Sequence, residues 1–183
     1  MAKNLIKGRC RVFGVLVALV SVGLFSSPAI AGATAAKTVT FSGKFSGKAS
    51  LLIQNSTVTI SSISGTGTNS LFGSSKVSGN GSAPKSGSSL CDPFGGKGSI
   101  AAGSNKLTFT VTKSSSQQGC SNGESGKVTI SFHGVAKATG GGGKGNGASG
   151  TLKFSGTLHL GGTSGSQTGN FTVSLNGKLT VKS

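Results

Sequence analysis

The sequence predicts an all-β fold: an antiparallel meander closed into a small β-barrel of about eight strands, preceded by a signal-peptide helix. Three observations support this prediction. Apolar residues recur at every second position over long stretches, glycines interrupt the apolar face of these stretches, and the N-terminus has the pattern of a secretory signal. We therefore expect a cleaved signal peptide at residues 1–31 and a single barrel domain at residues 32–183.

The N-terminal segment contains the parts of a signal peptide in the usual order. A basic region precedes an apolar stretch from Val12 to Phe25, which is too short for the roughly 20 residues that span a bilayer. Ala29 and Ala31 follow as a small-x-small cleavage site. Cys10 lies ahead of the apolar stretch, so it cannot carry a lipid after cleavage. We expect a secreted, extracellular protein without a transmembrane anchor.

The processed chain is strongly basic but poorly suited to nucleic-acid recognition. Removing residues 1–31 takes away four of the 18 lysines and arginines and neither acid, which leaves 14 lysines, two carboxylates and a net charge of +12. Arginine, tryptophan and tyrosine are then absent from the sequence. The side chains that best bind phosphate through two hydrogen bonds, and those that best stack on bases, are therefore missing. We expect no specific nucleic-acid partner. The lysines either maintain solubility and protect strand edges, or bind acidic surface polymers.

Four long segments alternate between apolar and polar residues, as half-buried strands do. They start near Val39, Val128, Leu152 and Phe171. In each segment a glycine falls on the apolar face, where it lets a long strand coil sharply, and this favours a barrel over a β-sandwich. These inward glycines include Gly47, Gly134, Gly156 and Gly177.

Within such a segment the apolar residues all have even numbers or all have odd numbers, and we call this property parity. Parity locates a bulge and tests a turn. The apolar positions shift from even to odd numbers near Ser61 and Ser62, which indicates one extra residue there. A two-residue turn at Asn176 and Gly177 would put the residues after it on the wrong face. We therefore expect either one strand over residues 170–182 or a three-residue loop with a bulge, and we prefer the single strand.

Two cysteines remain after processing, Cys91 and Cys120, and an even pair in an exported protein predicts a disulfide. Between them, matching the apolar faces of two strands predicts a hairpin with a four-residue loop at residues 103–106. Extending that register places Cys91 opposite residue 118, which is close enough to Cys120 for the bond. Closing this loop contributes roughly 3 to 4 kcal/mol in the chain-entropy model.

The two carboxylates of the chain, Asp92 and Glu124, flank these cysteines, so the disulfide would bring them to one rim. They are weak catalytic candidates for a paired-carboxylate site; the alternative is that each caps a turn and offsets nearby lysines. Two carboxylates are few ligands for calcium, and we expect neither a metal nor a cofactor. His133 and His159 fall on the polar face by parity and are expected to point away from the barrel interior.

A glycine-rich run separates two of the predicted strands. We expect a flexible connection there, because a phosphate-binding loop would need a strand-to-helix context and a lysine followed by serine or threonine. The residues of this glycine-rich turn are Gly140, Gly141, Gly143, Gly147 and Gly150.

This run, together with the strand predicted over residues 151–160, resembles the glycine-rich signature of the dirigent and allene-oxide-cyclase-like barrels. The resemblance implies an eight-stranded antiparallel barrel, often a trimer, with a lumen for a small apolar ligand. Gly142 and Gly145 stand where the signature has a threonine and an aromatic residue. The activities of that family rely on acidic and polar pocket residues, whereas the predicted inward positions of this chain are apolar. The fold can therefore be shared without the chemistry.

Three hypotheses about function remain. The leading one is a secreted, non-enzymatic barrel that binds a small apolar ligand in its lumen or acts through its surface. The sequence leaves open whether the barrel forms a homo-oligomer. The second is a cyclase- or isomerase-like enzyme that uses Asp92 and Glu124. The third is adhesion to acidic polymers of the cell envelope through the lysines.

Overall fold

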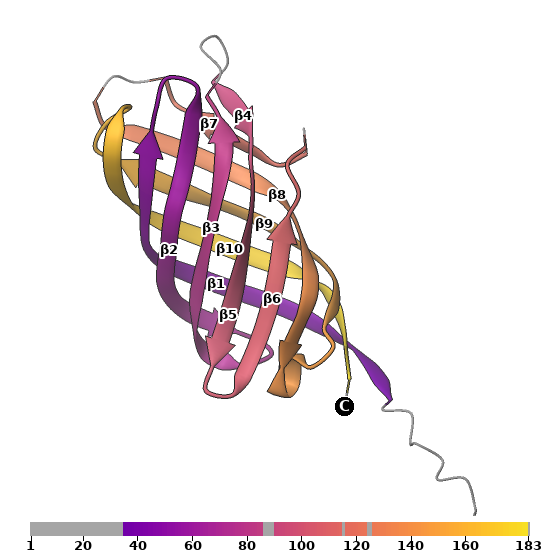
Figure 1. Cartoon of the computed structure of the whole chain (residues 1–183). Helices are drawn as coiled ribbons and strands as arrows, with labels where there is room; N and C mark the ends of the chain where they lie inside the picture. Colours follow the sequence, from indigo (N-terminus) through magenta and orange to yellow (C-terminus); the bar gives the residue numbers. More distant parts are fainter. Residues whose placement is uncertain (1–34, 86–89, 115, 124–125, 183) are drawn as a thin grey trace, which may run out of the picture. The chain divides into compact units, whose positions relative to one another are not determined.

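The computed structural model describes residues 35–85, 90–114, 116–123 and 126–182. The signal segment predicted at residues 1–31 lies outside these ranges. The described residues form strands and one short 3₁₀ turn, and none of their helical structure is long and apolar enough to cross a membrane (Figure 1). The elements are β1 (Ala36–Ile53), β2 (Thr57–Asn69), β3 (Gly73–Pro84), β4 (Cys91–Pro93), β5 (Gly95–Ala102), β6 (Asn105–Val111), β7 (Gln118–Ser121), β8 (Val128–Gly142), η1 (Gly143–Gly145), β9 (Ser149–Leu160) and β10 (Gly165–Lys182).

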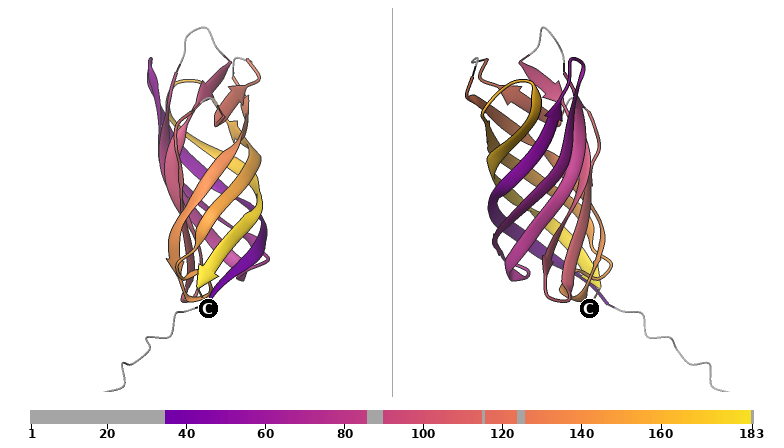
Figure 2. Two further views of the ribbon diagram at one scale, coloured as in Figure 1. Left: turned by 90° about the vertical axis from the view of Figure 1, so that its right-hand side faces the viewer. Right: turned by 60° about the vertical axis from the view of Figure 1, so that its left-hand side comes forward.

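Eight of the strands form a closed antiparallel barrel. Hydrogen-bonded neighbours follow the order β1, β2, β3, β5, β6, β8, β9 and β10, and the pairing of β10 with β1 closes the ring. Figure 2 shows these strands inclined to the barrel axis, as closure requires. The predicted all-β fold, the closed meander and the preference for a barrel over a sandwich are confirmed. The short strands β4 and β7 pair with each other and extend the sheet from β8, outside the ring.

The predicted strand faces are also confirmed. On β1, inward residues such as Phe41, Phe45 and Leu51 are buried, while the intervening polar residues are mostly exposed. The bulge lies where parity predicts it, because Ser50 pairs with Ser62 and the next residue of β1 pairs with Ile60. β10 continues without interruption through Asn176 and Gly177, so the single-strand prediction is confirmed and the three-residue loop is wrong.

The hairpin between β5 and β6 differs from the prediction. Ala102 pairs with Asn105, so the turn contains only Gly103 and Ser104 rather than four residues. A shift of two residues leaves every apolar side chain on the same face, and parity therefore cannot distinguish the two registers. Gly103 has a φ of 58°, which is the left-handed conformation that tight two-residue hairpin turns require.

The first three residues of the glycine-rich run belong to a strand and not to a connection. Gly140 to Gly142 continue β8 and pair with Lys106 to Thr108 of β6, after a register shift. A Cβ atom on Gly141 would lie 2.0 Å from the carbonyl oxygen of Lys106, so this close pairing is possible only for glycine. Gly140 to Gly142 therefore complete the barrel wall, and the connection to β9 starts with η1.

The two ends of the barrel differ in packing. The end that carries the β2–β3 turn, the β5–β6 turn and η1 is filled by side chains, and we call it the closed end. Hydrogen bonds of Asn69 stabilise the β2–β3 turn at this end. Its Nδ2 donates to Ser75 Oγ at 2.6 Å, and its Oδ1 accepts from the N–H groups of Leu71 and Phe72. We call the opposite end, with the β1–β2 and β9–β10 turns, the mouth. The largest fully buried side chains are Phe41, Ile100, Leu107, Leu152 and Leu179.

Candidate functional site

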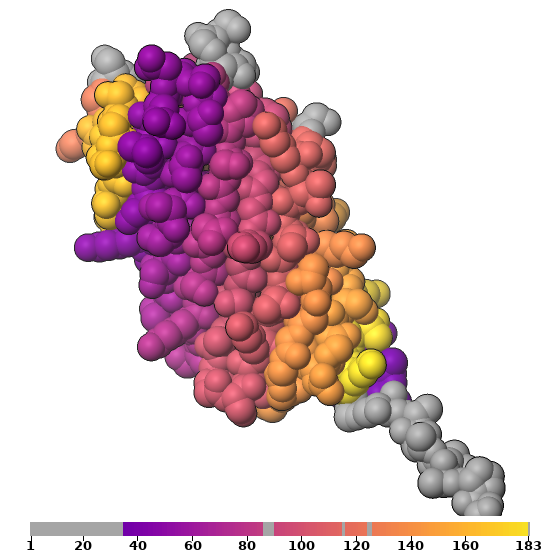
Figure 3. Space-filling model, in the orientation of Figure 1, coloured from indigo at the N-terminus to yellow at the C-terminus, as the bar shows by residue number. Residues whose placement is uncertain are grey.

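The half of the barrel next to the mouth contains a cavity of about 390 Å³. This volume lies within the range of about 300 to 1,000 Å³ that is usual for small-molecule sites. Figure 3 shows a continuous outer surface over β2, β3 and β5. The larger apolar residues of the lining are Leu51, Ile53, Val58, Ile60, Ile63, Val77, Leu90, Phe94, Phe109, Val111, Val128, Ile130, Phe132, Phe154, Leu158, Phe171, Val173 and Leu175.

Many of these lining side chains point inward and yet remain only half-buried. Because they belong to the inner face of a closed wall, the accessible part of their surface faces the lumen. When a ligand removes such apolar surface from water, the binding free energy becomes more favourable by about 25 cal/mol per Å². The half-buried lining residues are Val58, Ile60, Ile63, Phe94, Phe109, Val111, Ile130, Phe132 and Val173.

Inward glycines leave room along the wall for aromatic rings of the neighbouring strand, and this keeps the lumen open. In each case the ring tip, Cζ, lies 2.6 to 2.7 Å from the point that a Cβ atom on the glycine would occupy. The ring therefore lies along the wall over the glycine instead of crossing the lumen. The directly opposed pairs with this arrangement are Gly98 with Phe109, Gly156 with Phe132, and Gly134 with Phe154.

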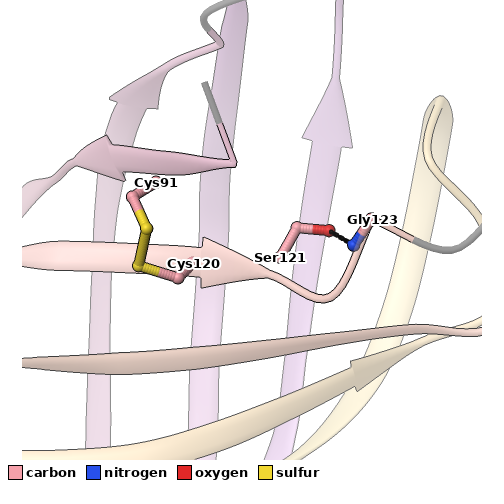
Figure 4. The surroundings of a disulfide bond; sticks show 4 residues. All are labelled: Cys91, Cys120, Ser121 and Gly123. Atoms are coloured by element: carbon pink, nitrogen blue, oxygen red, sulfur yellow. Dashed lines mark hydrogen bonds between the residues drawn. A yellow bond between two sulfur atoms is a disulfide. The ribbon is translucent and has the colours of Figure 1, made fainter. Parts of the chain in front are cut away.

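Strands β4 and β7 form a disulfide-bonded flap beside the mouth (Figure 4). The predicted bond between Cys91 and Cys120 is present, with 4.0 Å between the Cα atoms. Cys91 lies opposite Cys120 itself and not opposite residue 118 as expected. The ladders of β5–β6 and β4–β7 are not continuous, because two residues separate Pro93 from Gly96 whereas six separate Val111 from Gln118.

The flap places Asp92 at the mouth of the cavity. Asp92 opposes Gly119, and Gly119 opposes the inward Phe132, so these three positions share the inner face of the sheet. Asp92 is half-buried and contributes to the cavity lining. The sequence predicts only apolar inward residues, and Asp92 corrects that prediction. Parity had assigned no face to Asp92, because it lies in the short strand β4 (Cys91–Pro93), outside the long alternating segments.

Two further polar groups of the cavity lie at its rim, whereas Ser78, Asn80 and Lys97 contribute to the lining as exposed residues of β3 and β5. Lys85 follows β3, and its Nζ donates to the carbonyl oxygen of Thr163 in the β9–β10 turn at 3.2 Å. Ser121, at the end of β7, accepts a hydrogen bond through Oγ from the N–H of Gly123 at 3.1 Å (Figure 4). The cavity is therefore apolar in its depth and polar at its mouth.

The remaining predicted site residues do not join this cavity. His133 and His159 are exposed on the outer face, as predicted, and His159 Nδ1 lies 3.1 Å from Thr129 Oγ1. The glycine-rich run lies at the closed end. Among the described residues, no three metal-binding side chains come together. Glu124, Ala29 and Ala31 lie outside the described ranges.

Comparisons of the chain with protein-family models, with curated proteins and with solved structures found no match. The resemblance to the dirigent-type signature thus stays an expectation from the sequence.

Proposed function

We propose that this chain is an exported, non-enzymatic β-barrel protein that binds one small apolar ligand in its lumen. The observation that carries the proposal is the cavity of about 390 Å³, which is apolar in depth and lies above a fully packed closed end. Several kcal/mol of binding free energy are available from covering such a surface.

Export is supported by the signal pattern of residues 1–31 and is compatible with the disulfide between Cys91 and Cys120. Disulfides form and persist mainly in oxidising compartments. A barrel secured in this way suits a binding protein that works outside the cell.

Binding is favoured over catalysis by the chemistry of the lining. The ionisable residues among the described lining are Lys85, Asp92 and Lys97. Lys85 and Asp92 lie at the mouth, and Lys97 is an exposed residue of β5. A cyclase or isomerase needs an acid or base within hydrogen-bond reach of its substrate, and the depth of this cavity supplies apolar contacts instead.

The proposal is tested by titrating the purified chain with an apolar fluorescent dye and by native mass spectrometry. The variant Ile130→Trp fills the lumen from β8, and Ser131→Trp adds the same side chain one residue later on the outer face. We expect dye affinity to fall about tenfold or more, equivalent to about 1.4 kcal/mol, in Ile130→Trp only. The absence of dye binding and of any bound small molecule would restrict the protein to a role through its surface.

A second candidate function, adhesion to acidic polymers, is favoured by one cluster of lysines. Lys137 of β8 and Lys178 of β10 both oppose Thr151 of β9, and Lys153 is the next outward residue on β9. Diagonal neighbours of this kind lie about 7 to 8 Å apart. All three lysines are exposed, so their charges act together on a polyanion.

Adhesion is tested by eluting the chain from a polyphosphate or heparin matrix with increasing salt. Lys153→Gln is expected to elute at lower salt than Lys76→Gln, which removes an equal charge from β3, away from the cluster. Retention that does not depend on salt, or equal shifts in the two variants, would contradict this function.

A further inference from the structure

The lumen has two chemically different walls. Along one arc of the ring, from β1 through β2 to β3, the apolar side chains of the lining are all aliphatic: Ala49, Leu51, Ile53, Val58, Ile60, Ile63, Val77, Ala83 and Pro84. The polar residues that this arc adds to the lining, Ser78 and Asn80, are exposed residues of β3. We call this arc the aliphatic wall. Every described phenylalanine of the lining comes from the other arc, which we call the aromatic wall. Its rings are Phe94, just before β5, Phe109 of β6, Phe132 of β8, Phe154 of β9 and Phe171 of β10.

Neighbouring residues fix the rings of the aromatic wall in place. Phe109, Phe132 and Phe154 each rest on an opposing glycine, as described above. Phe94, Phe132 and Phe154 also contact one another, with ring centroids 5.8 to 6.4 Å apart in tilted and edge-to-face arrangements. A ligand therefore meets an aromatic surface that is already organised and that loses little side-chain entropy on binding.

Such a surface discriminates between apolar ligands. Two aromatic rings in an offset or edge-to-face arrangement gain affinity beyond that expected from buried area, by about two- to tenfold for each favourable pair. A saturated ligand gains from area alone. The aliphatic wall makes no such distinction, so the preference of the whole site is set by the aromatic wall.

We propose that the ligand is a flat aromatic or conjugated molecule with a single polar group, bound with its ring system against the aromatic wall and its polar group at the mouth. The polar group would meet the rim that contains Asp92, Ser121 and the carbonyl oxygen of Thr163. This inference rests on the proposed lumen binding and adds the chemical class of the ligand.

Two probes of matched size test the inference: 2-naphthol, and decahydro-2-naphthol, its saturated counterpart with the same hydroxyl group. Calorimetric titration of the purified chain measures the dissociation constant of each. The hydrophobic effect alone favours the saturated alcohol, which has more apolar surface. We expect 2-naphthol to bind about three- to tenfold more tightly in spite of this.

Variants in the two walls show where a preference originates. Phe132→Leu and, separately, Phe109→Leu keep an apolar side chain but remove a ring, and each is expected to lower the preference for 2-naphthol about two- to threefold. Ile63→Leu is the matched control in the aliphatic wall and is expected to leave the preference unchanged. Thermal unfolding of each variant verifies that it is folded.

The possible results separate the inference from the proposed function. Equal affinities, tighter binding of the saturated alcohol, or a preference that survives the loss of either ring would overturn the ligand class while leaving lumen binding intact. Failure of both probes to bind would overturn lumen binding as well.

Discussion

The tip of the Phe154 ring lies 2.7 Å from the point where a Cβ atom on Gly134 would be, because the two residues oppose each other on β9 and β8. Gly134 thereby holds the ring against the wall and leaves the lumen open. The same relationship recurs between Phe132 and Gly156. The width of the cavity thus depends on pairs of one aromatic residue and one glycine.

Gly134→Ala is expected to narrow the lumen. The new methyl group would displace the Phe154 ring and the Gln117 side chain, which both lie 2.7 Å from its position, and the ring can move only toward the cavity. We expect 2-naphthol affinity to fall about tenfold and the free energy of unfolding to fall by about 1 to 3 kcal/mol. Titration and chemical denaturation measure these effects.

Gly119→Ala is the control for that experiment. It adds the same methyl group to another glycine of the inner face, but the nearest atom, Cγ2 of Ile130, lies at an ordinary 3.5 Å. We expect almost no change in affinity or stability. Equal losses in the two variants would show that any added methyl group disturbs the site, which would contradict the role assigned to Phe154.

Removal of the disulfide is expected to destabilise the barrel. Cys91 and Cys120 are 29 residues apart in sequence, and the chain-entropy model gives about 3.5 kcal/mol for closing such a loop. The double variant Cys91→Ser/Cys120→Ser should therefore unfold at lower denaturant concentration. Treatment of the original chain with a reductant should give the same midpoint, and a midpoint unchanged by both would contradict a structural role of the bond.

Asn69→Ala is expected to weaken the closed end without affecting ligand binding. The substitution leaves the N–H groups of Leu71 and Phe72 without their acceptor and removes the donor to Ser75 Oγ. An unsatisfied buried group costs about 1 to 3 kcal/mol, and the two N–H groups are only part-buried, so the free energy of unfolding should fall by about 1 to 3 kcal/mol in total. Asn69→Asp keeps the acceptor and should recover part of the loss, while affinity for 2-naphthol should remain unchanged in both variants.

The predicted cleavage of the signal peptide can be checked from the mass of the secreted protein. Cleavage after Ala31 removes residues 1–31, and intact-mass spectrometry should show a chain that begins at Gly32. Ala31→Phe puts a large residue at the cleavage position and should leave the signal attached. Ala33→Phe, two residues later, serves as the control and should be processed normally. Export of an unshortened original chain would contradict the prediction.

Parity in the sequence was sufficient for the strand faces and the bulge near Ser61. It left two alternatives for residues 170–182, and the structure has the long strand. Parity was insufficient for the β5–β6 turn, because the registers with Ala102 opposite Leu107 or opposite Asn105 put the same side chains inside. The partner of Cys91 was misplaced by two residues for a different reason, because the β4–β7 ladder does not continue the register of the β5–β6 ladder. Glycine content was equally ambiguous at Gly140 to Gly142, where pairing with β6 replaces the expected flexible connection.

The sequence by itself determined which residues face inward, because alternation along a strand is a local property of the backbone. Only the tertiary structure decided what the inside contains. Ring closure brings Phe132 opposite Gly156 and places Asp92 at the mouth, and it leaves a cavity near the mouth while the closed end is filled. These relationships depend on contacts between residues distant in sequence and on the volume that side chains leave unoccupied, which no local pattern specifies.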